Sequence, residues 1–157
     1  MTKKEYKNLA SEAAGGDANA FSHLYELVYD EMYYSAFYSL KNDADTIEAV
    51  LGAARDGFRA VGRLHSEDSF RLFMMKTLCA RIKTFFREYG AQPETADFMI
   101  EAKSAMFQLE NRDRLCAALY MGGNCTPDEI AMYTGMARGT VKKRLARALD
   151  ILDLDLR

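Results

Sequence analysis

Apolar residues recur along this chain at helical spacing, and no stretch shows the strict alternation that is typical of a β-strand. Asp17 is a suitable N-cap, and the apolar positions after it lie on one helical face, at Phe21, Leu24, Tyr25, Val28, Met32 and Ala36. The polar stretch 41–43 ends this helix. The pattern predicts an all-α protein whose first long helix is strongly amphipathic.

A second helix is predicted to open at Asp45, because Glu48 follows three residues later as in a capping box. Gly52 and Gly57 weaken this helix by about 1 kcal/mol each. Its spacing places one set of apolar residues in the interior, namely Ile47, Val50, Leu51, Ala54, Phe58 and Val61.

A third helix is predicted to begin near Ser66 or Ser69. Its inward face carries Phe70, Phe73, Met74, Thr77, Leu78, Ile82 and Phe85. Positively charged residues form a stripe on its outward face, at Lys76, Lys83 and Arg87. These predictions define an N-terminal helical domain over residues 1–88.

Helical continuation is disfavoured after Tyr89, because residues 89–95 contain a glycine and one of the two prolines of the chain. We interpret residues 89–104 as an interdomain linker and leave the conformation of 97–103 open. A further helix is predicted from about Ala105 to Tyr120, with an inward face of Met106, Leu109, Leu115, Cys116 and Leu119. The sequence Gly122-Gly123-Asn124 closes it. This helix opens a C-terminal domain over residues 105–157.

Residues 126–149 have the pattern of a helix, a turn and a second helix. Thr126 is a suitable N-cap, Pro127 takes the first helical position and Gly135 ends the first helix. The second helix turns one face inward, at Val141, Leu145, Ala148 and Leu149. Its predicted outward face carries Arg138, Thr140, Lys142, Lys143, Arg144 and Arg147. A short helix that crosses a longer basic one is the arrangement of a helix-turn-helix reader of DNA.

The distribution of charge supports nucleic acid as a partner. The chain holds 21 basic and 23 acidic residues, yet residues 138–147 carry five cations and no acid. Residues 1–54 have a balance of −5, from four Lys and nine acids, and residues 55–87 a balance of +5, from eight basic and three acidic residues. A solvated basic surface without a ligand is the alternative interpretation of the C-terminal cluster. Clustering and motif together favour DNA binding.

The remaining chemistry-bearing residues do not indicate an enzyme, a cofactor or a metal site. Cys79, Cys116 and Cys125 show neither a C-x-x-C pair nor a disulfide spacing, which indicates packing residues in a reducing compartment. His23 and His65 have no metal-ligand spacing to the cysteines, and no glycine-rich phosphate loop is present. Without a membrane-spanning run or a signal peptide, the protein is expected in the cytoplasm and not at a membrane.

The order of these parts resembles a sigma factor of bacterial RNA polymerase, of the extracytoplasmic-function type. Residues 16–33 are similar to the first helix of that family, and residues 58–73 to its aromatic-rich segment. The C-terminal block 109–149 is the best match, with E-I-A, G-T-V-K and R-L-A-R-A. The resemblance implies two helical domains, and it covers nearly the whole chain except the linker.

The resemblance also implies partners and roles. The N-terminal domain would dock on the RNA polymerase core and face the proximal promoter element, with DNA contacts from Arg63, Lys76, Arg81 and Lys83. Arg63 and His65 would belong to a loop that cradles a flipped base. The phenylalanines of the same region, Phe58, Phe70 and Phe73, fit core packing better than base stacking. The second helix of the helix-turn-helix would read the distal promoter element. An anti-sigma protein is a further expected partner.

This chain departs from the family pattern in the helix that grips the polymerase. Where the family has D-x-x-Q-[DE]-x-F, residues 48–54 read E-A-V-L-G-A-A. Cys79 and Ala80 replace an asparagine and an arginine, no tryptophan is present, and Ala137 stands where a serine cap is usual. Two alternatives therefore stay open: a divergent sigma-like DNA-binding regulator, and a helical protein-interaction module without promoter-melting activity.

Overall fold

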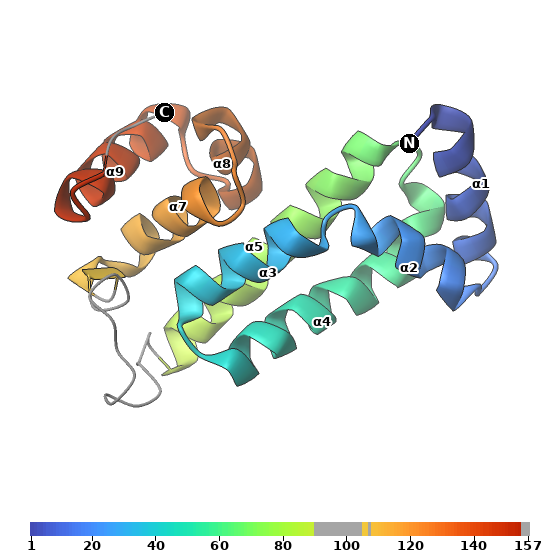
Figure 1. The fold of residues 1–157 in the computed structure, drawn as a ribbon, viewed down its shortest axis with the longest axis horizontal. Helices are drawn as coiled ribbons and strands as arrows, with labels where there is room; N and C mark the ends of the chain where they lie inside the picture. Colours follow the sequence, from blue (N-terminus) through green and yellow to red (C-terminus); the bar gives the residue numbers. More distant parts are fainter. Residues whose placement is uncertain (90–104, 107, 155–157) are drawn as a thin grey trace.

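The structure is a computed structural model that describes residues 1–89, 105–106 and 108–154. The secondary-structure elements of the described residues are all helices, and these residues contain no β-strand (Figure 1). The predicted all-α fold class is confirmed. The predicted linker at 89–104, including the open segment 97–103, lies outside the described residues except for Tyr89.

The N-terminal bundle consists of α1 (Lys3–Ala14), α2 (Ala18–Glu26), α3 (Tyr29–Leu40), α4 (Asp43–Ala60), the short 3₁₀ helix η1 (Val61–Arg63) and α5 (Glu67–Tyr89). The sequence reasoning missed α1. Its signal is a capping box, in which Thr2 accepts from the Glu5 amide at 3.1 Å and Glu5 accepts from the Thr2 amide at 3.0 Å. Tyr6 of α1 is buried and donates to the Leu64 carbonyl at 2.7 Å, so α1 is fixed against the segment after η1.

The helix predicted after Asp17 is interrupted at Val28 and forms two helices, α2 and α3. Asp17 is the N-cap as predicted, and its side chain accepts from the Asn19 amide at 2.9 Å. The predicted core positions Phe21, Leu24, Val28, Met32 and Ala36 are all buried. The helical face was therefore predicted correctly, although the interruption was not.

The predicted inward face of α4 is partly wrong. Ile47 and Leu51 are 51% and 46% exposed. The buried face instead carries mainly small residues, Thr46, Ala49, Val50, Gly52, Ala53, Ala54, Gly57 and Ala60. A Cβ atom at Gly52 would collide with the guanidinium of Arg81, and one at Gly57 with the sulfur of Met74. The two glycines thus let side chains of α5 approach α4, which rotates the packing face away from the larger apolar residues. The N-cap is also Asn42 instead of Asp45, because Asn42 accepts from the Asp45 amide at 2.9 Å.

α5 begins as predicted, since Ser66 and Ser69 exchange hydrogen bonds of 3.0 Å between side chain and amide. Its core side chains are Phe70, Met74, Met75, Leu78, Cys79 and Ile82. Phe73, Thr77 and Phe85, which were predicted to be buried, are only partly so.

The C-terminal bundle consists of α7 (Asn111–Met121), α8 (Pro127–Thr134) and α9 (Arg138–Ile151). The helix predicted from about Ala105 is not continuous, because Leu109 and Glu110 are not helical and α7 starts at Asn111. Leu115, Cys116 and Leu119 are buried as predicted. Gly122 ends α7 with its amide donating to the Ala118 carbonyl at 2.7 Å.

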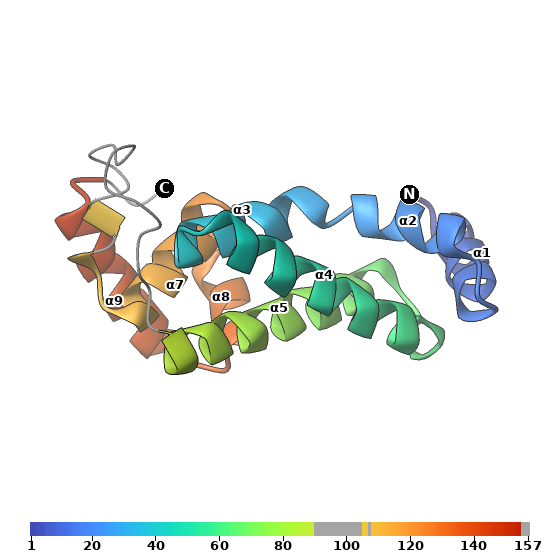
Figure 2. The same ribbon diagram turned by 90° about the horizontal axis from the view of Figure 1, so that it is seen from below.

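The two bundles pack directly against each other, with α7 beside α3 and α8 beside α5 (Figures 1 and 2). One cluster of buried apolar residues runs through both, from Tyr6 to Leu149. Arg114 of α7 is almost fully buried and donates to the Ser39 carbonyl of α3 at 2.9 Å. Lys83 of α5 donates to the Thr134 carbonyl at the end of α8.

Gly122 lies at a close approach of the two bundles. A Cβ atom there would lie 2.7 Å from the Tyr34 carbonyl oxygen of α3. Because that obstacle is backbone, we expect Gly122→Ala to lower the free energy of unfolding by about 1–3 kcal/mol, as overpacking does. Gly139→Ala is the matched control, since a Cβ at Gly139 meets nothing within 4 Å. Urea unfolding of both variants measures the effect, and a Gly122→Ala variant as stable as the control would contradict this account of the interface.

Candidate nucleic-acid interface

The turn between α8 and α9 is built by the residues that the sequence indicated. Thr126 accepts from the Glu129 amide at 3.2 Å, and Glu129 accepts from the Thr126 amide at 2.9 Å, so a capping box opens α8. Gly135 ends α8 in the left-handed conformation, with φ of 77°, which a residue with a Cβ rarely adopts. α9 begins at Arg138, three residues after Gly135. The predicted helix-turn-helix geometry is present.

α9 is held to the rest of the bundle by the predicted apolar face. Val141, Leu145, Ala148 and Leu149 are 0–2% exposed. Ala137 is the N-cap residue, and its side chain gives no hydrogen bond to the first-turn amides of α9. Because the apolar face of α9 is buried, its opposite face is turned toward solvent over the first two turns.

Three of the predicted DNA-contacting residues point to solvent on this face, Thr140, Lys142 and Lys143. Neither lysine forms an ion pair with a described residue. Arg138 is 65% exposed and pairs with Asp128 of α8, at 2.9 Å between Nη2 and Oδ2. The start of α9 therefore presents two unpaired ammonium groups, a hydroxyl and one guanidinium with an exposed partner.

Of the last two basic residues predicted to face outward, Arg147 does so and Arg144 is largely buried. Both are hydrogen-bonded to Asp113 of α7: Arg144 Nη1 at 2.9 Å from Oδ1, and Arg147 Nε at 2.9 Å from Oδ2. The Asp113 side chain is only 4% exposed and that of Arg144 only 19%, whereas Arg147 keeps 57%. Burial raises the pKa of Asp113, but the hydrogen bonds from Arg147 and Arg144 outweigh it and leave the pKa below its ordinary value. Asp113 is a residue that sequence reasoning missed.

The predicted basic residues of the N-terminal bundle divide into two groups. Arg63 and Lys76 are exposed. Arg81 pairs with Asp56 of α4 at 2.8 Å and covers Gly52, and Lys83 is bound to the Thr134 carbonyl. The structure thus brings Lys83 to the helix-turn-helix, while Arg63 and Lys76 remain on the N-terminal bundle.

The aromatic residues of the same region mostly serve packing. Phe70 is fully buried, and the ring of Phe58 stacks on Phe21 with centroids 4.9 Å apart. His65 is exposed beside the segment fixed by Tyr6. Burial raises the pKa of the Cys79 thiol to about 12 and that of Cys116 to about 11, so both are neutral packing groups as the sequence indicated.

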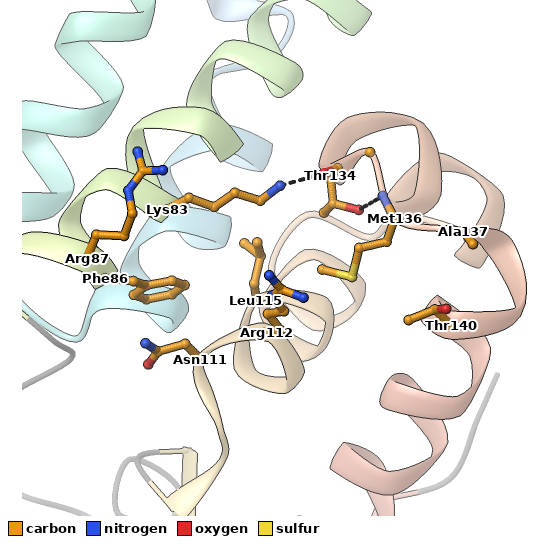
Figure 3. A pocket seen from close by; sticks show the side chains of 11 residues that line it. Lys83, Phe86, Arg87, Asn111, Arg112, Leu115, Thr134, Met136, Ala137 and Thr140 are labelled. Atoms are coloured by element: carbon orange, nitrogen blue, oxygen red, sulfur yellow. Dashed lines mark hydrogen bonds between the residues drawn. The ribbon is translucent and has the colours of Figure 1, made fainter.

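A cleft of about 540 Å³ lies between the two bundles (Figure 3). Its walls come from the end of α5, the start of α7 and the turn between α8 and α9. Lys83 and Thr140, predicted for different promoter elements, both line it. Within the described part of the chain, no group of three or more His, Cys, Asp and Glu residues is arranged to hold a metal ion. No described helix is long and apolar enough to cross a membrane.

Comparison with known proteins gives a structural likeness. No family profile and no curated protein sequence matches the chain. Among solved structures, CnrH, determined in complex with the cytosolic domain of CnrY, superposes with a TM-score of 0.71. The match covers 95% of this chain and 95% of that chain, at 19% sequence identity. The likeness at this identity shows that the two chains share a fold.

Proposed function

We propose that this protein is a sigma-like transcription initiation factor. In this proposal α9 reads the distal promoter element, and the N-terminal bundle binds the RNA polymerase core. The observation that carries it is the solvent face of α9, where Thr140, Lys142 and Lys143 are exposed on the second helix of a helix-turn-helix and the two lysines form no ion pair with a described residue. Such a face can enter the major groove and contact bases and phosphates.

The shared fold supports the same proposal, because CnrH is a sigma factor of the extracytoplasmic-function type. CnrH was captured with a cytosolic partner domain. An anti-sigma protein is accordingly part of the proposal as a regulatory partner. Promoter DNA and core polymerase are the other two partners.

We propose different roles for the predicted DNA contacts according to their exposure and partners. Lys142, Lys143 and Thr140 are proposed as direct contacts in the distal element, with Arg138 joining them when it leaves Asp128. Arg147 keeps an exposed side chain and can meet a phosphate while it is bound to Asp113. We propose that Arg144 instead acts by fixing α9 against α7. In the proximal element, exposed Arg63 and Lys76 are the proposed contacts, and Arg81 and Lys83 support the helices that carry them.

The polymerase contact is proposed for α4. Ile47 and Leu51 are one helical turn apart and exposed, and Glu48 lies between them on the same side. At the position where the family carries a glutamine, this chain has Leu51, so the exposed face of α4 is apolar there. A DNA-binding regulator that does not use polymerase is the second candidate function, and this altered face is the observation that favours it.

Pull-down with core RNA polymerase, followed by transcription from a promoter library, tests the proposal. We expect the chain to associate with the core and to give promoter-specific transcripts. Leu51→Asp should abolish core association, because it places a charge in the proposed apolar contact, while Lys4→Glu on α1 serves as a surface control. Promoter-specific DNA binding without core association would establish the regulator instead.

A further inference from the structure

The cleft between the two bundles has an unusual charge for a protein with more acids than bases. Lys83 and Arg87 of α5 and Arg112 of α7 line it, and its lining contains no acidic residue among those that the structure describes. Arg87 and Arg112 are exposed, and Arg112 forms no ion pair with a described residue. Three cations from the two bundles therefore line one cavity, without a counterion among the described residues.

The start of α9 adds to this positive field. Ala137 and Thr140 lie in the wall of the cleft. α9 is 14 residues long, and its first-turn amides have no side-chain cap. Peptide dipoles place a partial positive charge at such a helix start, and the free amides can donate to an anion. The three cations and the start of α9 therefore both favour binding of an anion in the cleft.

The apolar part of the cleft suits a flat ring. Phe86, Leu115 and Met136 line it beside the cations (Figure 3). The Phe86 ring is already held by the guanidinium of Arg114, whose carbon lies 5.2 Å from the ring centroid. A cavity of about 540 Å³ with apolar walls and a few polar groups falls within the size range of small-ligand sites.

We propose that this cleft binds a free nucleotide. Its phosphates would lie against Arg112, Arg87 and Lys83 near the start of α9, and its base against Phe86 and Met136. Lys83 is held in place by the Thr134 carbonyl and keeps N–H groups for a phosphate.

The effect of nucleotide binding on transcription rests on the proposed function. A nucleotide in the cleft would touch both bundles and cover Thr140, so it would hold the bundles together and compete with promoter DNA. In this way a soluble metabolite would adjust transcription by this factor through mass action.

Isothermal titration calorimetry of the full chain tests the binding, with ATP, GTP, pyrophosphate and adenosine as separate probes. We expect a nucleotide Kd in the micromolar range and binding at least ten times weaker for adenosine, which lacks phosphate. Arg112→Glu should weaken nucleotide binding at least tenfold. Lys4→Glu is the control, because Lys4 is also exposed and lies on α1 outside the cleft. Arg112 is exposed, so the urea midpoint of its variant should match wild type.

Three results would overturn the proposal: no nucleotide binding up to millimolar concentration, equal losses in the two variants, or binding of a single-stranded DNA 12-mer but of no free nucleotide. These outcomes are independent of the polymerase experiment. A chain that binds ATP but does not associate with core polymerase retains the cleft proposal and loses the sigma-like function.

Discussion

Replacing Asp113 by alanine will destabilise the C-terminal bundle more than any surface substitution in it. The carboxylate is buried and accepts three hydrogen bonds, from Arg144 Nη1 at 2.9 Å and from Arg147 Nε and Nη2 at 2.9 and 3.0 Å. Its removal leaves the largely buried guanidinium of Arg144 with only the exposed Glu110 carboxylate, 3.5 Å away, and we expect a loss of about 3 kcal/mol in the free energy of unfolding. Urea unfolding at pH 7 measures it, with Asp150→Ala on exposed α9 surface as the control.

The pH dependence of this loss separates the ionic contribution from packing. The pKa of Asp113 lies below its ordinary value of 3.8, so the unfolded chain takes up its proton at a higher pH than the folded chain. The contribution is therefore complete above about pH 4 and is lost as the pH falls through the lowered folded-state pKa. Wild type and Asp113→Ala should converge in stability at acid pH. A difference that stays constant down to pH 2 would show that packing, and not the charge, accounts for it.

The double substitution Lys142→Glu and Lys143→Glu will weaken DNA binding but, unlike Asp113→Ala, will leave the stability of the fold unchanged. Both side chains are exposed and unpaired among the described residues, so stability should change by less than about 0.5 kcal/mol. Affinity for promoter DNA should fall about 100-fold, and the salt dependence of binding should become shallower by about two counterions. Fluorescence anisotropy over a range of salt concentrations measures both quantities.

Lys3→Glu with Lys4→Glu is the control for this experiment. It changes net charge equally, on the exposed face of α1. If the control loses as much affinity as the α9 variant, DNA binding depends on overall charge and the proposed role of α9 is wrong. Core association should survive in both variants, because neither alters α4.

The sequence predicted the helix-turn-helix well because its signals are local. Thr126, Pro127 and Gly135 act through their own backbone and the residues three or four positions away, and each occupies the predicted position. The prediction of α4 failed at Ile47 and Leu51 for the opposite reason. Which face of α4 is buried depends on how closely α5 approaches at Gly52 and Gly57, and residue spacing along one helix contains no information on that distance.

In the candidate site, too, local features could be predicted from the sequence and contacts between helices could not. That α9 is basic and amphipathic could be read from residues 138–149. That Arg144 is held by Asp113, 31 positions away, could not, because an acid at the start of a helix is equally favourable as a partner of the helix dipole. The interdomain cleft was likewise not predictable, since it arises from the packing of segments on both sides of the linker.

Because of Gly122 and Gly123, the C-terminal bundle packs against the N-terminal bundle and does not move independently of it. The two glycines allow α7 to reach the α3 backbone, and the buried apolar cluster continues across the contact into α8 and α9. Separation of the bundles exposes that apolar surface to water, at an energetic cost that grows with its area. If the proposed function requires the bundles to separate on two DNA elements, binding of polymerase and DNA would have to offset this cost, and the closed form would disfavour binding of either partner alone.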